Sequence, residues 1–186
     1  MNDYRGTNHF SDIELEKIKN NLNERKRWLE ENDIKFYITV APNKHTIYSE
    51  YLPSNIDEYN EKSRLDQLIA YLSKNSEVEI IDLRPVLMEN KEQYTLYKKN
   101  DTHWNSLGAF LAYSEIANSI KKDSVNIEPM TLDHYSIQKI TCGGDLANML
   151  SMNDIILDEH LILSPNFESG VRDVEVEKTG IPILIY

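Results

Sequence analysis

The sequence has little cysteine, a shortage of basic charge and no long apolar run. Cys142 is the single cysteine among 186 residues, so an internal disulfide and a cysteine-based metal cage are both excluded. Lysine and arginine number 20 against 31 acidic residues, which gives a formal net charge of −11. A surface of that charge repels phosphate groups. We therefore expect neither nucleic acid nor an anionic membrane surface as a partner.

Other familiar signatures are also missing. The longest apolar stretches, such as Ile181 to Tyr186, fall far short of the roughly 20 residues needed to cross a bilayer. The chain does not open with a basic segment and an apolar core typical of an export signal. Gly143-Gly144 has neither the Walker lysine nor dinucleotide spacing, and no two histidines lie close together. We expect no cofactor and no metal site.

The first half of the chain alternates between helical and strand patterns. A capping box at Ser11 and Glu14 predicts the start of a helix. Lys35 to Val40 is β-branched and aromatic, which predicts a buried strand, and the loop after it carries Lys44 and His45. A helix over 57–73 and a strand over 78–83 follow. Strand, helix, strand is typical of a right-handed crossover in a parallel sheet, so we predict an α/β sandwich.

The second half continues the alternation less clearly. The patterns predict a helix at 105–121 capped by Asn105 or Ser106, a strand at 134–140, a short helix at 145–150, extended segments at 155–163 and 171–176, and a buried strand at 181–186. Open α/β sheets bind and react at the carboxyl ends of their strands. The last predicted strand is the final element of the chain.

Asp101 and His103 are the residues that indicate chemistry. They lie two apart, just before a predicted helix, and in an extended segment they would project to the same side. A carboxylate beside an imidazole can hold the ring tautomer while the ring accepts a nucleophile's proton. Asp-x-His alone is weak evidence, because it also occurs by chance as a helix-entry aspartate beside an ordinary histidine.

Further motifs give this pair a context. Asp101-Thr102-His103-Trp104-Asn105 resembles the Asp-x-His-Trp segment of the AlgX/AlgJ-type SGNH-hydrolase-like proteins, which O-acetylate exported polysaccharides such as alginate. The resemblance runs from about Phe36 to Tyr186. It includes a strand and Pro-x-Lys loop at 40–48 leading to Tyr51-Leu52-Pro53, an Asp-Leu-Arg segment at 82–84, and a Gly-Asp-Leu loop at 144–146.

The resemblance implies a three-layer SGNH-hydrolase-like sandwich with a mostly parallel sheet, as one domain over 1–186. It implies a permuted triad in which Asp101 is the orienter and His103 the base. The family's serine follows a late apolar strand inside Asp-Ser, and the matching strand is 181–186. Only Ser124 follows an aspartate here, at another position. We therefore expect the domain to be incomplete at its C-terminus and to lack the nucleophile.

Three residues are weaker candidates for substrate binding. Lys44 could contact a carboxylated sugar or position the site, although an exposed lysine in a turn is the ordinary explanation. Trp104 could line a sugar cleft, although a tryptophan beside a helix start is more often part of a core. Asp145 could lie near the site, or it could cap the short helix that follows.

The expected function is that of an SGNH-like O-acyltransferase or esterase domain acting on a carbohydrate or acyl-ester substrate, with an acetyl donor as a possible partner. Resemblance alone also implies a place outside the cytoplasm. Three alternatives stay open. These are an inactive domain that binds a glycan or a partner, a plain serine esterase that uses Ser106 or Ser151, and a metal-dependent hydrolase with Asp101 and His103 as ligands.

Overall fold

The computed structural model describes residues 5–56, 62–123, 127–166 and 183–185. The chain forms two compact units. The first comprises residues 1–40, 50–82 and 176–186, and the second comprises 41–49 and 83–175. The expectation of one domain over 1–186 stays a prediction. Among the described residues, no helix is long and apolar enough to span a membrane.

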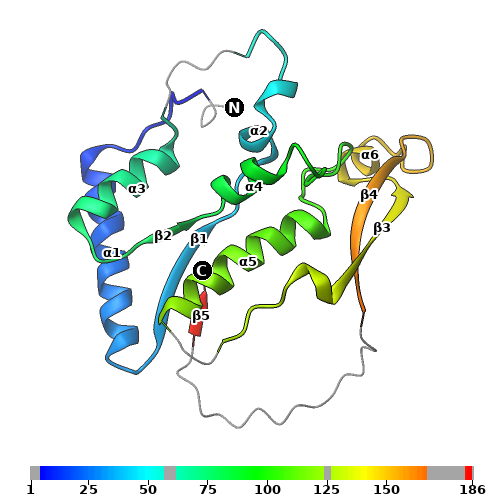
Figure 1. The fold of residues 1–186 in the computed structure, drawn as a ribbon. Coiled ribbons are helices and arrows are strands. Elements are labelled where there is room, and N and C mark those ends of the chain that lie inside the picture. Colours follow the sequence, from blue (N-terminus) through cyan, green and yellow to red (C-terminus); the bar gives the residue numbers. More distant parts are fainter. Residues whose placement is uncertain (1–4, 57–61, 124–126, 167–182, 186) are drawn as a thin grey trace. The chain divides into compact units, whose positions relative to one another are not determined.

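The first unit is built on a short parallel sheet (Figure 1). Strand β1 (Lys35–Val40) lies in the centre, with β2 (Ile80–Asp82) and β5 (Ile183–Ile185) on either side, both parallel to it. Parallel neighbours need a crossover, and helix α3 (Arg64–Asn75) supplies it between β1 and β2. The predicted α/β class with a parallel sheet is confirmed.

Two helices of the first unit begin at capping boxes. Ser11 and Glu14 exchange hydrogen bonds at the start of α1 (Asp12–Glu30), as predicted. Ser63 and Asp66 do the same for α3. The predicted start of this helix at residue 57 lies outside the described residues, and the cap at Ser63 fixes the described start at Arg64. Helix α1 packs on β1 and α3 through a core formed by Leu15, Leu29, Leu72 and Val78.

The second unit combines helices with an antiparallel ribbon (Figure 1). Its helices are α2 (Lys44–Ile47), α4 (Arg84–Asn90), α5 (Ser106–Asp123), the short 3-10 turn η2 (Leu132–His134) and α6 (Asp145–Met149). Strands β3 (Tyr135–Cys142) and β4 (Asp158–Pro165) pair antiparallel along their full length. Helix α5 packs on α4 and β4 over a core of fully buried side chains, namely Ile47, Leu83, Leu87, Leu96 and Leu107.

Several boundaries differ from the prediction. The expected loop at Lys44 is the short helix α2, and the expected strand over 78–83 is reduced to β2. Helix α4 was missed because Pro85 suggests a break in the chain, whereas here it lies in the helix's first turn, where proline is tolerated. Segment 171–176 lies outside the described residues. A further 3-10 turn, η1, spans Ser49–Tyr51.

Candidate active site

Asp101 and His103 lie in a tight loop that precedes α5. The loop is closed by an isolated antiparallel bridge between Tyr97 and Trp104. The prediction that the two residues share one side of an extended segment is wrong, because residues 101–103 form a bend. The pair meets through turn geometry, since Asp101 Oδ1 accepts the backbone N–H of His103 at 2.9 Å. An aspartate that bonds the N–H two residues ahead forms an Asx turn.

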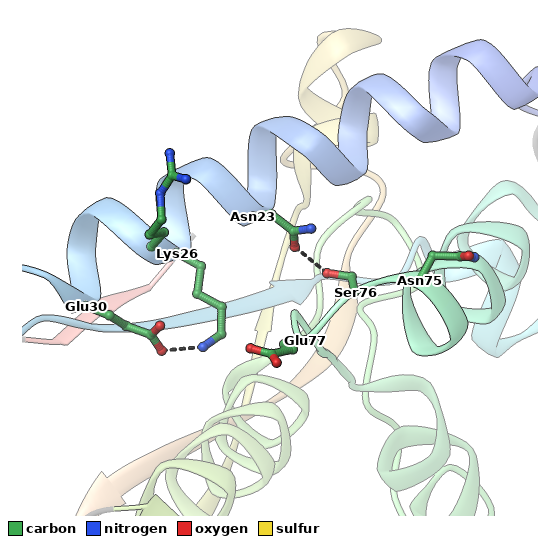
Figure 2. A pocket seen from close by; sticks show the side chains of 7 residues that line it. Asn23, Lys26, Glu30, Asn75, Ser76 and Glu77 are labelled. Atoms are coloured by element: carbon green, nitrogen blue, oxygen red, sulfur yellow. Dashed lines mark hydrogen bonds and ion pairs between the residues drawn. The ribbon is translucent and has the colours of Figure 1, made fainter.

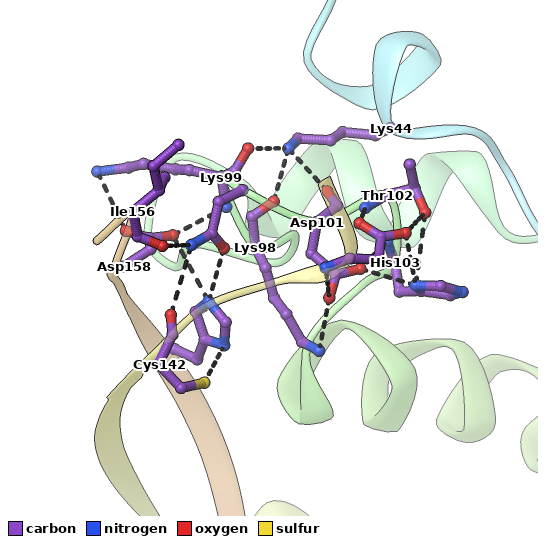
Figure 3. Close-up of polar contacts among 12 residues, drawn as sticks. Lys44, Lys98, Lys99, Asp101, Thr102, His103, Cys142, Ile156 and Asp158 are labelled. Carbon is purple, nitrogen blue, oxygen red and sulfur yellow. Dashed lines mark hydrogen bonds and ion pairs between the residues drawn. The ribbon is translucent and has the colours of Figure 1, made fainter. Parts of the chain in front are cut away.

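The ring of His103 bonds to the same carboxylate (Figure 3). Nδ1 lies 2.7 Å from Asp101 Oδ1. An ionised carboxylate only accepts hydrogen bonds, so Nδ1 carries the proton and Nε2 of the neutral ring keeps its lone pair. No described residue bonds Nε2, and 70% of the His103 side chain is exposed, against 8% for Asp101. The arrangement presents a buried orienter and a solvent-facing base.

The charge of Asp101 is held by several donors. Burial raises the pKa of its carboxyl, but hydrogen bonds from the His103 N–H, the His103 ring, Lys98 and the Asp145 N–H outweigh burial and hold the pKa well below its usual range. The Lys98 ammonium lies 3.2 Å from Oδ2. Asp101 is therefore a permanent anion across the physiological pH range, as an orienting carboxylate must be.

Asp145 lies near Asp101 and His103, which is one of the two roles predicted for it. Its carboxylate accepts the Thr102 N–H at 2.8 Å and the Thr102 hydroxyl, and Oδ2 is 3.5 Å from His103 Nδ1. Asp145 is the first residue of α6, and Gly144 is the N-cap. The structure thus gives Asp145 a role in holding the bend, while direct contact with a substrate stays a prediction.

Lys44 reaches the same loop from α2. Its Nζ donates to the carbonyl oxygens of Lys98, Lys99 and Asp101 at 2.6, 2.9 and 3.1 Å (Figure 3). These three bonds match the three donors of an ammonium group. Burial lowers the pKa of Lys44, and nearby carboxylates, including that of Asp101, oppose this effect. Lys44 therefore acts on the backbone of the loop, and a contact with a carboxylated sugar stays a prediction.

Trp104 and the start of α5 follow the loop. Trp104 is half-buried, and its ring lies 6.5 Å from that of Tyr97. Asn105 caps the helix, because its Oδ1 accepts the N–H groups of Leu107 and Gly108, each at 3.0 Å. Ser106 is the first residue of the helix. The sugar-binding role of Trp104 stays a prediction.

Atoms of Asp101, His103 and Asp145 lie within 4.8 Å of one another, a spacing that could hold a metal ion. Their hydrogen bonds favour a different use. The Nδ1 that faces the two carboxylates donates to Asp101, and Asp101 Oδ2 already accepts from Lys98 and Asp145. A ligating nitrogen must be free of its proton. The observed bonding fits the predicted orienter and base, and this assignment stays a prediction.

The first unit holds a cavity that is lined by polar and charged side chains (Figure 2). It has a volume of about 580 Å³, and its lining residues are Asn23, Lys26, Arg27, Glu30, Asn75, Ser76 and Glu77. Lys26 pairs with Glu30, and the Ser76 hydroxyl donates to Asn23. Four of the lining side chains are thus paired with one another, and the lining contains neither a histidine nor a cysteine. The chemistry indicated by the sequence lies in the second unit.

Comparison with known proteins places the site in a family. Residues 3–160 match the family model described as "SGNH hydrolase-like domain, acetyltransferase AlgX". The chain belongs to this family. The SGNH-hydrolase-like fold expected from the motifs is thereby confirmed. Its Asp-x-His-Trp segment lies within the matched residues.

Individual relatives agree with the family assignment. The chain is 25% identical over 128 residues to a "probable alginate O-acetylase AlgJ" of Pseudomonas syringae, covering 68% of this chain and 32% of that protein. It spans about a third of the length of the curated relatives it matches. These relatives are therefore considerably longer proteins.

Solved structures show the same fold. A DHHW family protein from Eubacterium siraeum has a TM-score of 0.58 at 22% identity, covering 80% of this chain and 47% of that one. The O-acetyltransferase domain of Pseudomonas putida AlgJ has a TM-score of 0.53 at 18% identity, covering 83% and 58%. Identities this low support a shared fold, and the activity has to be argued from the site.

Sequence reasoning missed several residues around the loop. Lys98 bonds Asp101, and Thr102, between the two predicted residues, bonds Asp145. Asn100, Cys142 and His160 form a neighbouring cluster. The spacing of Lys98 before Asp101 carries no recognisable motif. Cys142 and His160 lie on different strands, so their proximity depends on the register of β3 and β4.

Proposed function

We propose that this chain carries the base and orienter of an SGNH-like O-acetyltransferase that modifies a polysaccharide. The observation that carries the proposal is the Nδ1–Oδ1 distance of 2.7 Å in a pair whose imidazole is exposed and whose carboxylate is buried. Family membership and the alginate O-acetylase relatives support acetyl transfer to a sugar hydroxyl. Resemblance to exported-polysaccharide enzymes supports a place outside the cytoplasm.

In this mechanism Nε2 of His103 takes the proton of a serine hydroxyl while the oxygen attacks the acetyl carbonyl. The ring becomes an imidazolium, and Asp101 stabilises that charge at 2.7 Å from Nδ1. The proton then passes to the departing group, which leaves an acetyl group on the serine. A sugar hydroxyl next attacks this acetyl group while His103 takes its proton, and the serine oxygen departs and recovers that proton. The family's pattern assigns the nucleophile to a serine after the strand that matches β5.

Acetyl transfer by the full-length gene product tests the proposal. The substrates are a chromogenic acetyl ester as donor and an uncharged oligosaccharide as acceptor, with mass spectrometry as the readout. We expect His103→Gln to reduce transfer by at least about 10³-fold, because the base is lost. Lys122→Gln, an exposed lysine at the end of α5, is the matched control and should leave transfer unchanged.

Three outcomes would contradict the proposal. Transfer that survives in His103→Gln would favour an esterase with another base. Transfer that disappears on chelation and returns with a divalent cation would favour the metal-dependent alternative. Oligosaccharide binding without any turnover by the wild-type protein would favour the glycan-binding alternative.

A further inference from the structure

A second histidine lies in the same unit, with different partners. His160 of β4 is almost fully buried, with 2% of its side chain exposed. Its Nδ1 lies 3.2 Å from the Sγ of Cys142, the last residue of β3. The antiparallel register pairs Cys142 with Asp158 and Ile140 with His160, so the thiol and the imidazole are diagonal neighbours on one face of the ribbon.

Asn100 fixes which nitrogen of His160 carries the proton. The amide Nδ2 of Asn100 donates to the carbonyl oxygens of Ile156 at 2.9 Å and Cys142 at 3.4 Å. Its Oδ1 therefore faces His160 Nε2, at 3.2 Å, and it can only accept. Nε2 carries the hydrogen, so Nδ1 of the neutral ring accepts the S–H of Cys142.

The result is a thiol, a base and an orienting amide in series. A nucleophile within hydrogen-bond reach of a base that a third group orients is the general signature of covalent catalysis. The free Nδ1 of His160 can accept the thiol proton as sulfur attacks, so the base assists the nucleophile directly. The mechanism proposed for His103 uses none of these three side chains.

A cavity of about 330 Å³ opens beside this thiol. Cys142 and His160 both line it. The remaining wall is mainly apolar, with one cation, and consists of Lys98, Trp104, Asn105, Ser106, Ala109, Ile140, Leu161 and Ile162. This volume is at the lower end of ligand pockets, and its composition suits a small, weakly polar group rather than a sugar chain.

We propose that Cys142 is a second nucleophilic site, which takes a small acyl group from an acyl thioester. The Sγ–H proton moves to Nδ1 of His160, and sulfur bonds to the carbonyl carbon. The carbon–sulfur bond of the donor then breaks, and the departing thiolate takes the proton from Nδ1. The products are S-acyl Cys142 and a free thiol, with no oxidant or reductant consumed.

The charged groups around the pair include both signs. The carboxylate of Asp158 lies 3.8 Å from His160 Nε2 and accepts the backbone N–H of Lys99 at 2.9 Å. Lys98 lines the cavity and bonds Asp101. The ammonium of Lys99 is 4.0 Å from Asp158 and largely exposed. The imidazole of His160 is the group that hydrogen-bonds the thiol, so it should dominate the thiol's reactivity.

Acylation of the 186-residue chain by the acetyl thioester of N-acetylcysteamine tests the proposal. Intact mass and peptide mapping measure acetyl addition at Cys142 in the folded chain and in the same chain unfolded by urea. We expect the folded chain to react at least about tenfold faster at neutral pH, because His160 Nδ1 can accept the thiol proton as sulfur attacks the carbonyl carbon. A folded chain that reacts no faster than the unfolded chain would overturn the proposal.

Two variants test whether the acylation depends on the His160 base or only on the accessibility of the thiol. Cys142→Ser should abolish the acetyl addition, and His160→Gln should lower its rate to that of the unfolded chain. Because His160 is buried, circular dichroism must show that the glutamine variant is folded. If that variant is not folded, the rate of alkylation by iodoacetamide is measured instead, in the folded and in the unfolded wild-type chain. A folded chain that is alkylated faster than the unfolded chain supports the proposal, and one that is alkylated no faster overturns it.

The experiment also separates this site from the acetyltransferase site. His103→Gln, which should abolish acetyl transfer to sugar, should leave the acylation of Cys142 unchanged. Loss of both reactions in that variant would show that the thiol has no independent nucleophilic function and would overturn the inference. Loss of sugar transfer alone supports both proposals.

Discussion

The two buried partners Asn100 and Asp101 are adjacent in sequence, yet each orients a different histidine. Asp101 bonds Nδ1 of His103 and leaves Nε2 exposed, whereas Asn100 bonds Nε2 of His160 and leaves Nδ1 to the thiol. One partner is an anion and the other a neutral amide. The comparison teaches that the orienting group selects the reactive nitrogen, and that its charge decides whether it also stabilises the imidazolium.

Asp101→Asn is the most direct test of this difference, because it makes the two orienting groups alike. The amide loses the charge that stabilises the His103 imidazolium and can hold the wrong tautomer. We expect acetyl transfer to fall by about 10³- to 10⁴-fold, measured as kcat/KM on the full-length protein. The acylation of Cys142 should be unchanged. A transfer rate within tenfold of wild type would show that Asp101 is no orienter.

Gly144→Ala should damage both sites at once. A Cβ at this position would lie 2.3 Å from the carbonyl oxygen of Asn100 and 2.6 Å from its Oδ1. The backbone that carries both orienters must then shift, at a cost of about 3 kcal/mol in the free energy of unfolding. Urea denaturation measures this loss. Met149→Ala, at an exposed position of the same helix, should cost almost nothing, and equal losses would contradict the prediction.

Acid should weaken the contribution of Asp101 to stability. The folded-state pKa of Asp101 lies below its unfolded value of about 3.9, so its contribution is complete above that value and is lost as pH falls toward the folded pKa. We expect about 2 kcal/mol of unfolding free energy to depend on this group. The stability difference between wild type and Asp101→Asn should therefore shrink below about pH 4. A difference that stays constant to pH 2 would contradict this prediction.

Lys44→Met gives the smallest expected effect. It removes three hydrogen bonds to the loop, but it also relieves the burial of an ammonium group, so we expect a loss of about 1 kcal/mol in unfolding free energy. A fall in kcat without a change in KM would identify Lys44 as a positioning residue. A rise in KM with kcat unchanged would instead support the substrate contact first predicted for it. Lys122→Met is the matched control.

Local patterns predicted those parts of the fold that local physics decides. The Ser11 capping box, the β-branched strand β1 and the apolar segment that contains β5 need only neighbouring residues to be interpreted. Helix α4 was missed because Pro85 can either end a segment or begin a helix. The choice between these two roles depends on the packing of Leu87, which is fully buried.

The candidate site was predictable only in part. Asp101 and His103 were found because they lie two residues apart and resemble a family motif. The contact of Asp145 with Thr102 joins residues 43 apart, and that of Asn100 with His160 joins residues 60 apart. Such pairs depend on the docking of α6 and on strand register, which a sequence pattern does not encode. The bend that brings the pair together was likewise mistaken for an extended segment.

The position of Asn100 directly before Asp101 also has a practical use. A fluorinated tag attached to Cys142 would lie beside the His160 ring, which bonds Asn100, the neighbour of the residue that orients the exposed imidazole. Its fluorine resonance would then respond when a sugar or an acyl donor reached His103, although the tag itself stays off that ring. The single cysteine thus provides a built-in place for a spectroscopic reporter.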